Sequence, residues 1–581
     1  MIEKEMTTSQ QPLLQRLRDY VNSEFATQFA NLERQWALPL GERVIRGYAI
    51  EGLKVDNIND RSIRLSCETN ESRFREGDFL VLHRSTPTGL EAAQVLLEYD
   101  DETLLEVSLQ SGNPFFLQTE PQGWIADESI LDLRHFHLDA LDEVADSLRG
   151  REIILPMLSG DRSPKIDFAR YERALKLAQE SGLDSSQAEA VAKAYATDLF
   201  HLIQGPPGTG KTFVLAHLVR MLVADGQRVL VSALTHRAIN NALNKIYDVD
   251  AALPVCKVGL TPRATGLKVP NYENFVLSGF GDMRSGYAVG ATPFALRSNR
   301  LAGIEFDVII FDEASQITLP LAIMGMLSGQ KSIFIGDEHQ LPPVTSLKGT
   351  GLGNTSIFGF LSGRGAESML TTTYRLNDVL AKWPSQQFYD NQLVPDPVIA
   401  TRRLKLHEMN GIWDHVLEPN SPAVFIDLGH RGNTTRSHKE AETVVELIEA
   451  LLYARVLPSQ IGVVVPYRAQ GRLIRNLLRE TLDHEETARE IIVDTVERMQ
   501  GQEREVVLVS LTTSNSAFAA QLADFFFQPQ RLNVAITRPR TKLIIVGSRT
   551  VLEATPYDST EQDWVEMLRS LLDSCTKFTL G

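Results

Sequence analysis

The sequence is poor in cysteine, and its cysteines are scattered. The 581 residues contain three of them, Cys67, Cys256 and Cys575, and none forms a CxxC pair. Structural zinc sites and iron–sulfur clusters use about four ligands, with cysteines usually in such pairs, so these three residues cannot assemble either kind of site. We therefore expect buried, reduced thiols in an intracellular protein.

Long apolar runs are also missing. No stretch of eighteen apolar residues occurs, and the first five residues carry acidic side chains with no apolar segment after them. These absences argue against a membrane-spanning helix and a secretory leader. We expect a soluble, cytoplasmic protein without a membrane partner.

An excess of positive charge is a third absence. The chain has 58 basic and 74 acidic residues, which give a net charge of −16 at pH 7. Proteins that cover nucleic acid with their whole surface usually carry a net positive charge. Any nucleic-acid site in this chain is therefore expected to be a local basic strip.

The first third of the chain changes character twice. Apolar residues recur at helical spacing over 13–32, which predicts an opening amphipathic helix. Short β-rich segments separated by Asn, Asp and Gly turns follow, and helical periodicity returns over 130–148 and 167–179. We predict a helical stalk over 1–42, a β-barrel accessory domain over 43–112 with strands at 44–50, 62–67 and 79–83, and a helical connector over 113–182.

Beyond residue 183, short apolar strands alternate with helices. Eight strands are predicted, at 200–203, 229–232, 308–311, 333–335, 424–426, 462–465, 506–509 and 543–546. Strands that are apolar on both faces and joined by helices are typical of parallel sheets in α/β domains. The predicted fold class is therefore α/β, with two tandem parallel-sheet domains over 183–348 and 366–581 and a Gly-rich linker at 349–365.

The first of these strands is followed by a phosphate-binding sequence. Residues 205–212 read Gly-Pro-Pro-Gly-Thr-Gly-Lys-Thr and match G-x-x-x-x-G-K-[ST] between the strand at 200–203 and an apolar helix at 213–222. The glycines let backbone N–H groups surround phosphates, and the helix N-terminus adds a favourable dipole. The alternative is a Gly-rich turn that arose by chance. The predicted ATP contacts here are Gly205, Pro206, Pro207, Gly208, Thr209, Gly210, Lys211 and Thr212.

Within this loop, Lys211 would place its charge on the β- and γ-phosphates, and Thr212 would be a ligand of Mg²⁺. The strand at 308–311 ends in two carboxylates, Asp312 and Glu313. Asp312 would hold Mg²⁺, and Glu313 would orient and deprotonate the attacking water. The alternative is a pair of surface acids that cap the next helix.

An ordered series of further short motifs runs from residue 183 to residue 548. In the first predicted domain these are Leu-Asp-Ser-Ser-Gln at 183–187, Thr-His-Arg-Ala-Ile-Asn at 235–240, Asp-Glu-Ala-Ser-Gln at 312–316 and Gly-Asp-Glu-His-Gln-Leu-Pro-Pro at 336–343. In the second they are Thr-Tyr-Arg at 373–375, Val-Val-Pro-Tyr-Arg-Ala-Gln at 464–470, Asp-Thr-Val-Glu-Arg-Met-Gln-Gly-Gln-Glu at 494–503 and Arg-Leu-Asn-Val-Ala-Ile-Thr-Arg at 531–538. The series resembles superfamily 1B helicases of the up-frameshift and immunoglobulin-μ-binding type.

The resemblance implies two RecA-like domains that close over one ATP and its Mg²⁺. Gln187 would read the adenine, Tyr374 would stack on it and Glu503 would complete the ATP site. Gln187 also fits a capping box with Asp184, so it has a purely structural interpretation as well. The implied catalytic residues are Lys211, Glu313, Gln340, Arg375 and Arg538, the last two reaching the γ-phosphate from the second domain. A lone arginine of this kind could equally form a surface ion pair.

The resemblance further implies a monomeric motor that moves 5′-to-3′ along single-stranded nucleic acid. The implied contacts are Thr235, Asn240, Thr292, Pro466, Tyr467 and Thr495. Residues 290–293 depart from the family's usual Thr-Cys-like pair, Pro539 replaces a small helix former, and 247–287 is short for an inserted subdomain. Residues 74–81 are similar to the family's barrel signature, and no Cys/His-rich module is evident. The expectation is an almost bare motor.

Two alternatives stay open at this point. One is a nucleic-acid-stimulated ATPase that remodels protein–nucleic-acid complexes without unwinding. The other is an AAA-type ring ATPase or signalling NTPase that acts on protein, which predicts a single α/β core followed by a helical lid. Backbone contacts and base stacking suit both DNA and RNA, so the residues do not choose between them. Neither do they choose between repair, RNA surveillance and defence.

Overall fold

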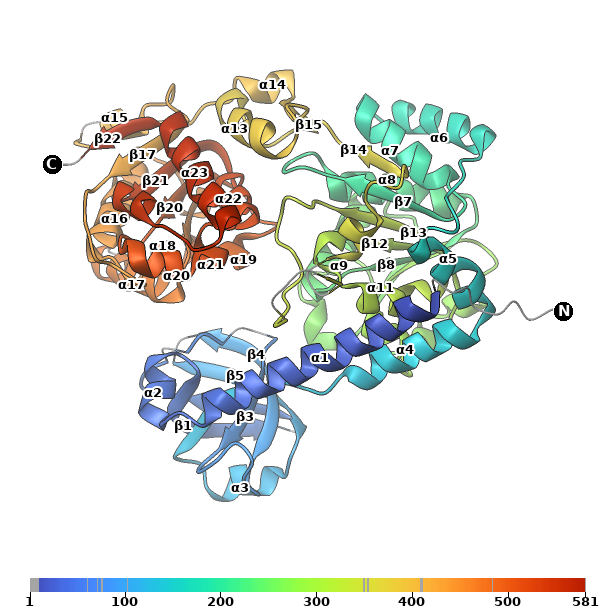
Figure 1. Ribbon diagram of the computed structural model, residues 1–581, viewed down its shortest axis with the longest axis horizontal. Coiled ribbons are helices and arrows are strands. Elements are labelled where there is room, and N and C mark those ends of the chain that lie inside the picture. The colour runs from blue at the N-terminus through green and yellow to red at the C-terminus, as the bar shows by residue number, and fades with distance from the viewer. Residues whose placement is uncertain are drawn as a thin grey trace. The chain divides into compact units, whose positions relative to one another are not determined.

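A computed structural model describes residues 10–59, 61–70, 72–74, 77–101, 103–347, 351–352, 355–407, 411–482 and 484–579 (Figure 1). Two compact units divide the chain: the smaller holds residues 15–139 and 345–353, and the larger holds the remainder. The predicted α/β class with a preceding barrel is confirmed. In the part of the chain described, no helix is long and apolar enough to cross a membrane.

The smaller unit contains a closed six-stranded antiparallel barrel in the order β1-β2-β5-β4-β3-β6. Its strands are β1 (Ala49–Asn59), β2 (Ser62–Ser66), β3 (Phe79–His83), β4 (Ala93–Asp101), β5 (Leu104–Ser111) and β6 (Trp124–Ser129). Alternate side chains fill the interior, among them Leu80 and Trp124, which are both fully buried. Of the predicted barrel signature at 74–81, residues 75 and 76 lie outside the described residues, and Phe74 is buried in the barrel core.

Two details of the predicted barrel differ from the structure. The predicted end at 112 is too early, because β6 pairs with both β1 and β3 and closes the barrel. Its sequence, Trp-Ile-Ala-Asp-Glu-Ser, is too polar to predict a strand. Trp124 and Ala126 face the barrel core, whereas Asp127 lies on the opposite face of the strand, where it is buried and pairs with Arg43 and His83. The predicted strand at 44–50 begins later, at Ala49, because Leu40–Ile45 form helix α2 and Gly47 turns the chain at φ 74°.

The larger unit contains two large parallel sheets and a third of only two strands (Figure 1). The first has the order β10-β9-β11-β8-β12-β13-β7-β14 and the second the order β19-β18-β20-β21-β17-β22. The eight predicted strands are all present, as β7 (Phe200–Gln204), β8 (Arg228–Ser232), β12 (Phe306–Phe311), β13 (Gly329–Gly336), β17 (Ala423–Asp427), β18 (Ile461–Val465), β20 (Arg504–Ser510) and β21 (Pro539–Gly547). A second complete sheet rules out the predicted alternative of a single α/β core followed by a helical lid.

The strands of the larger unit that the sequence did not predict are short. They are β9 (Val255–Val258), β10 (Asn271–Tyr272), β11 (Tyr287–Gly290), β14 (Glu367–Met369), β15 (Thr372–Thr373), β16 (Val394–Pro395), β19 (Ile492–Thr495) and β22 (Thr576–Thr579). Most of them lie at sheet edges, where fewer neighbours bury the strand and the apolar pattern is weak.

Helices cover the sheets and connect the strands. In the first half of the chain they are α1 (Gln10–Trp36), α2 (Leu40–Ile45), α3 (Pro114–Thr119), α4 (Arg134–Asp146), α5 (Leu155–Ser159), α6 (Phe168–Glu180), α7 (Ser185–Ala196), α8 (Lys211–Ala224), α9 (His236–Val249), α10 (Pro293–Leu296), α11 (Leu319–Met326) and α12 (Ile357–Leu361). In the second half they are α13 (Asp378–Phe388), α14 (Pro397–Ala400), α15 (Asp414–Leu417), α16 (His438–Tyr453), α17 (Arg468–Thr481), α18 (Glu485–Glu490), α19 (Val496–Met499), α20 (Ser516–Gln521), α21 (Ala523–Phe526), α22 (Pro529–Ile536) and α23 (Ser559–Ser574).

The predicted boundary between the two sheet domains is also displaced. Of the predicted linker at 349–365, residues 349, 350, 353 and 354 lie outside the described residues, while α12 packs against β13 of the first sheet. The predicted start of the second domain at 366 falls inside the first, because β14 pairs in parallel with β7. Glu-Ser-Met is too short and polar a strand to be recognised from its pattern. The chain crosses to the second domain after Met369.

We predict that Trp124→Ala lowers the free energy of unfolding of the barrel by about 3–5 kcal/mol, because a large side chain is removed from a closed core. Urea denaturation followed by far-UV circular dichroism measures this. Tyr99→Ala, which removes a 45% exposed ring from β4, is the control and should change the stability by less than about 1 kcal/mol. If the two losses were equal, β6 would not be part of the barrel core.

Candidate active site

The predicted phosphate loop joins β7 to the N-terminus of α8. Gly208 and Gly210 have φ angles of 76° and 83°, in the left-handed region that favours glycine. The loop therefore turns tightly and leads into a fourteen-residue helix whose N-terminus is suited to bind an anion. The Lys211 Nζ atom donates to the Gly205 carbonyl oxygen at 2.5 Å, which holds the ammonium group over the loop.

A segment of the second domain lies directly on this loop. The Thr373 hydroxyl donates to the Pro207 carbonyl oxygen at 2.9 Å, and the Tyr374 N–H donates to the Gly208 carbonyl oxygen at 2.8 Å. A Cβ atom on Gly208 would lie 2.4 Å from the Cβ atom of Arg375. Glycine at this position thus permits the contact as well as the turn, and the contact places Arg375 beside the phosphate loop.

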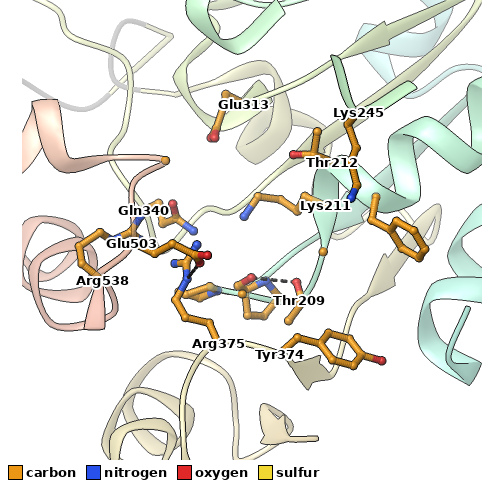
Figure 2. A pocket seen from close by; sticks show the side chains of 16 residues that line it. Thr209, Lys211, Thr212, Lys245, Glu313, Gln340, Tyr374, Arg375, Glu503 and Arg538 are labelled. Carbon is orange, nitrogen blue, oxygen red and sulfur yellow. Dashed lines mark hydrogen bonds and ion pairs between the residues drawn. The ribbon is translucent and has the colours of Figure 1, made fainter. Parts of the chain in front are cut away.

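A cavity of about 440 Å³ opens where the two domains meet. Figure 2 shows Lys211 on one side and Arg375 on the other, facing the same space. Its lining contains thirteen of the predicted site residues, namely Pro206, Pro207, Gly208, Thr209, Gly210, Lys211, Thr212, Glu313, Gln340, Tyr374, Arg375, Glu503 and Arg538. Phe213, Lys245 and Gly501 also line it and were not predicted: Phe213 and Lys245 lie in no motif, and Gly501 belongs to the motif at 494–503 but was assigned no contact.

Asp312 lies at the end of β12 and is buried. Burial, followed by the neighbouring Glu313, raises its pKa to about 7, so the ionised form needs a cation nearby. Two buried hydroxyls near Asp312 have no hydrogen-bond partner. One belongs to Ser232, at the end of the neighbouring strand β8, and the other to Ser315, three residues further along the chain. Oxygen donors of this kind fit Mg²⁺, which commonly takes one or two protein ligands and completes its shell with phosphate oxygens and water. Thr212 and Asp312 are the residues that would hold the ion.

The described residues contain no group of three or more His, Cys, Asp or Glu side chains that could hold a metal ion by itself. A site that depends on substrate phosphates is consistent with that finding. Glu313, the neighbour of Asp312, has a φ of 53°, which is strained for a residue with a side chain. This backbone turn directs its carboxylate into the cavity (Figure 2), where Gln500 Nε2 lies 3.4 Å away.

The two predicted arginines reach the cavity, but each has a partner there. Arg375 Nε donates to Glu503 at 2.6 Å. Burial alone would raise the pKa of Glu503, but Arg375 and Arg540 outweigh burial and hold the pKa at about 2. Arg538 is 2% exposed, and burial together with Arg375 lowers its pKa to about 9. Glu503, which was predicted to bind ATP, is therefore the carboxylate that neutralises Arg375 in this state.

Gln187 does not line the cavity. It forms the predicted capping box with Asp184, and its Nε2 atom donates to the Thr209 carbonyl oxygen at 3.0 Å. The amide is 3% exposed and fully engaged, so a role in reading adenine stays a prediction. Tyr374 is 40% exposed at the rim of the cavity, and its hydroxyl donates to Asp184 at 2.8 Å.

The predicted nucleic-acid contacts of the first domain lie at the ends of two paired strands, β8 and β11. The Thr235 hydroxyl accepts the Ala238 N–H and caps α9, and Thr292 precedes α10. Asn240 faces inward: its Nδ2 atom donates to the Arg263 carbonyl oxygen, and its Oδ1 atom accepts from Lys257 at 2.7 Å. Asn240 therefore uses its side-chain amide to hold the segment that follows β9 and does not present it on an exposed surface.

A basic strip lies near the N-terminus of α9. The sequence predicted such a strip but not the residues that form it. Burial first, and then Lys257, Arg263 and Arg300, lower the pKa of His236 to about 4. These three cations thus lie near the N-terminus of α9. Lys257 is fully buried, so the partly exposed Arg263 and Arg300 supply the charge that, with the helix dipole, favours an anion. Lys257 and Arg263 fall in the short segment 247–287, which matches no motif, so no sequence pattern singles them out.

In the second domain, Pro466 follows β18 and Thr495 ends the neighbouring strand β19. The Tyr467 ring is stacked on Phe525, with centroids 5.7 Å apart, and its hydroxyl lies 3.2 Å from that of Thr513. The ring is therefore partly buried with Phe525 against it, and its contact with nucleic acid stays a prediction. Thr495 Oγ1 is buried without a partner.

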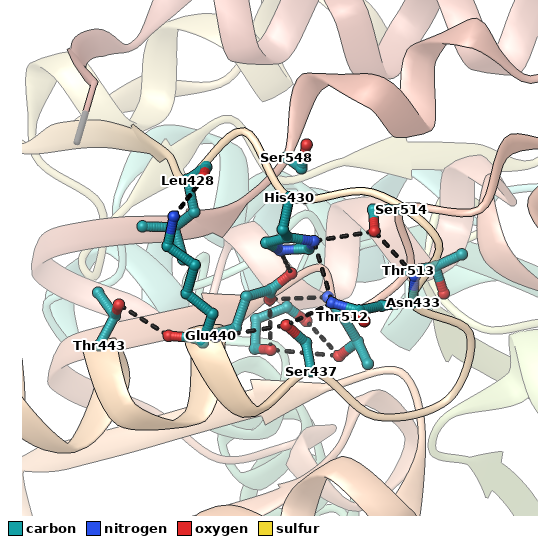
Figure 3. Close-up of polar contacts among 12 residues, drawn as sticks. Leu428, His430, Asn433, Ser437, Glu440, Thr443, Thr512, Thr513, Ser514 and Ser548 are labelled. Carbon is teal, nitrogen blue, oxygen red and sulfur yellow. Dashed lines mark hydrogen bonds and ion pairs between the residues drawn. The ribbon is translucent and has the colours of Figure 1, made fainter. Parts of the chain in front are cut away.

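Figure 3 shows a polar cluster in the second domain that the sequence did not predict. Glu440 is fully buried and accepts from His430 Nε2, the Ser510 hydroxyl and the Thr512 N–H at 2.7–2.8 Å. Lys439 Nζ donates to the carbonyl oxygen of Leu428, the first residue after β17, as Lys211 does to that of the first residue after β7. β17 lies between β21 and β22 as β7 lies between β13 and β14. Side chains thus fill the position equivalent to the phosphate site.

Known proteins are similar to this chain over most of its length. Two family models, each described as an AAA domain, match residues 182–267 with 288–348 and residues 354–550, more than half of the 581 residues. The DNA replication ATP-dependent helicase/nuclease DNA2 of Saccharomyces cerevisiae is 29% identical over 462 residues, with 72% of this chain and 29% of that protein covered. The DNA polymerase alpha-associated DNA helicase A of Schizosaccharomyces pombe is 29% identical over 454 residues, with 66% of each covered.

The crystal structure of the arterivirus nonstructural protein 10 helicase has a TM-score of 0.39 and 14% identity, with 91% of this chain and 82% of that chain covered. This chain spans less than a third of the length of the Saccharomyces relative and 66% of the Schizosaccharomyces relative. With the two AAA-domain matches, the paired parallel sheets and the phosphate loop between them, the chain belongs to the superfamily 1 helicases.

Proposed function

We propose that the protein hydrolyses ATP to move along single-stranded nucleic acid and to unwind duplexes. The observation that carries the proposal is the cavity of about 440 Å³, lined by the phosphate loop on one side and by Arg375 and Arg538 of the second domain on the other. An arginine supplied across a domain cleft makes hydrolysis depend on closure, and is worth roughly 10³–10⁵ in rate. One chain supplies both sides, so a monomeric motor is sufficient.

In this proposal the triphosphate binds the loop N–H groups and the Lys211 ammonium, which leaves the Gly205 carbonyl. Mg²⁺, held by Thr212 and Asp312, would neutralise charge on the β- and γ-phosphates. Glu313 accepts a proton from the attacking water, and Gln340 orients that water on the γ-phosphate. Loss of the γ-phosphate removes the anion that attracts the arginines, and the cleft opens.

Nucleic acid would bind at the carboxyl ends of the strands in both domains. Arg263 and Arg300, which are both partly exposed, offer the local basic strip required in a chain of net charge −16, while the buried Lys257 holds Asn240 in place. Thr235, Thr292, Pro466 and Thr495 lie at strand ends suited to backbone contacts. If the two domains grip a strand alternately as the cleft opens and closes, each ATP moves the protein by one step. From the family resemblance we propose that this movement is 5′-to-3′.

The names of both curated relatives refer to DNA, so we propose single-stranded DNA as the first substrate to test, with RNA as the alternative. Three free cysteines suit a reducing compartment, and the cytoplasm is the location we propose. A strand-displacement assay beside an ATPase assay separates a helicase from an ATPase that remodels protein–nucleic-acid complexes.

We predict that Lys211→Ala and Glu313→Gln each lower the nucleic-acid-stimulated ATPase rate by at least about 10²-fold, since one removes the phosphate cation and the other the general base. A coupled assay at saturating single-stranded DNA measures the rate. Lys176→Ala and Glu180→Gln, on the exposed face of α6, are matched controls that should keep the full rate. Turnover retained by either site variant would contradict the assignment.

We predict that Gly208→Ala blocks closure. Its Cβ atom would clash with Arg375 at 2.4 Å, and we expect the stimulated rate to fall by at least about 10²-fold because the arginine cannot approach. Gly226→Ala is the matched control: its φ of 78° gives the same backbone strain, of about 1–2 kcal/mol, with nothing within 4 Å. Equal rates for the two variants would show that strain, not the contact, matters.

We predict that Arg263→Ala and Arg300→Ala each weaken single-stranded DNA binding and flatten its salt dependence. Removal of one phosphate-binding cation should reduce the slope of log affinity against log salt by about 0.7. Fluorescence anisotropy across a salt series measures the slope. Arg569→Ala, which removes a surface arginine paired with Glu566 on α23, should leave it unchanged, and an unchanged slope in the first two variants would place the nucleic acid elsewhere.

A further inference from the structure

Asp337 directly follows β13 and is fully buried, and its carboxylate accepts hydrogen bonds from three side chains near the cavity. One carboxylate oxygen accepts from Gln204 Nε2 at 2.6 Å. The other accepts from both Gln340 Nε2, at 2.7 Å, and the Tyr389 hydroxyl, at 2.8 Å. Gln204 is the residue before the phosphate loop and Gln340 lines the cavity, so Asp337 contacts two elements that surround the nucleotide site.

Tyr389 connects this carboxylate to the second domain. Its ring is part of that domain's apolar core, and its hydroxyl accepts from Asn533 Nδ2 at 2.8 Å. The same Nδ2 atom donates to the His339 carbonyl oxygen at 2.8 Å. Asn533 belongs to α22, whose last residues hold Arg538: the Val534 carbonyl oxygen accepts from Arg538 Nε at 2.8 Å. A chain of hydrogen bonds therefore runs from Gln340 to α22, the helix that ends two residues before Arg538.

The backbone holds Tyr389 firmly in place. The two residues that follow it, Asp390 and Asn391, both have left-handed φ angles, of 49° and 61°. Asp and Asn tolerate this conformation better than other side chains, but two in succession persist only where the surroundings require them. Burial, followed by the charge of Asp337, raises the pKa of Tyr389 well above its ordinary value, so the hydroxyl stays protonated and remains a donor.

Two features indicate that this chain has a second arrangement. Gln340 and Tyr389 donate to the same oxygen of Asp337. When Gln340 turns toward a γ-phosphate, its hydrogen bond to that oxygen is lost and the one from Tyr389 remains. The Oδ1 atom of Asn533 is buried and has no partner in this state, which is costly unless a donor reaches it in another one. The hydrogen bond that the Tyr389 hydroxyl donates to Asp337 thus depends on the position of Gln340, and the one that it accepts from Asn533 depends on the position of α22.

We propose that Tyr389 is a positioning residue that couples the γ-phosphate side of the ATP site to α22. Because Arg531 of α22 pairs with Glu497, two residues after the predicted nucleic-acid contact Thr495, nucleic-acid binding accelerates hydrolysis through the Tyr389 hydroxyl. The proposal rests on the proposed function, because it concerns how that motor is stimulated. Tyr389 itself does not line the cavity and touches no substrate. Through its bonds to Asp337 and Asn533, Tyr389 makes a shift of Gln340 depend on a shift of α22 and therefore of Arg538.

The test is Tyr389→Phe, which removes the hydroxyl and keeps the ring. We expect the stimulation factor, the ATPase rate with single-stranded DNA divided by the rate without it, to fall about tenfold, as for loss of a hydrogen bond to a charged acceptor. The KM for ATP without nucleic acid should stay within about twofold, because the hydroxyl does not reach the ATP cavity. Tyr557→Phe is the matched control, since that ring is fully exposed, and should match the wild type.

A purely structural role would lower the unfolding temperature and reduce the basal and stimulated rates by the same factor, and that result would overturn the proposal. So would an unchanged stimulation factor. Asn533→Ala provides an independent test if Tyr389→Phe does not fold: it should lose stimulation to a similar extent, and the double variant should lose no more than either alone. Absence of stimulation in the wild type would instead contradict the proposed function.

Discussion

The contact between the phosphate loop and residues 373–375 is the constraint on which the rest of the larger unit depends. Two hydrogen bonds tie Thr373 and Tyr374 to the carbonyl oxygens of Pro207 and Gly208. Because the segment is tied to the loop itself, Arg375 lies at the edge of the phosphate site. Glu503 pairs with its guanidinium group and neutralises the charge there.

The two sheets show how one architecture supports one nucleotide site instead of two. In both, a lysine in the first turn of the helix after the inner strand donates to the first carbonyl oxygen beyond that strand, Lys211 to Gly205 and Lys439 to Leu428. The first domain follows its strand with a glycine-rich turn and leaves a cavity. In the second, the buried Glu440 accepts hydrogen bonds from His430, Ser510 and Thr512, so polar side chains occupy the corresponding place.

Much of this organisation is predictable from sequence because it depends on local patterns. The phosphate loop has a fixed spacing, and the inner strands are apolar on both faces, so residues 200–212 identify both. Short edge strands such as β14, and β6 with its buried Asp127, carry no such pattern. Side-chain partners are harder still: Asn240 and Tyr467 belong to recognisable motifs, yet their contacts with Lys257 and Phe525 arise from segments that only the fold brings together.

The central claim is that both arginines act on a γ-phosphate held by the loop. The most direct measurement is a crystal structure with Mg²⁺, ADP and aluminium fluoride, a mimic of the transferring phosphoryl group. The account predicts that Arg375 leaves Glu503 and that the Arg375 and Arg538 guanidinium groups both lie within hydrogen-bond distance of the fluoride ligands. A mimic bound to the loop with Arg375 still paired to Glu503, and with neither arginine in contact, would contradict it.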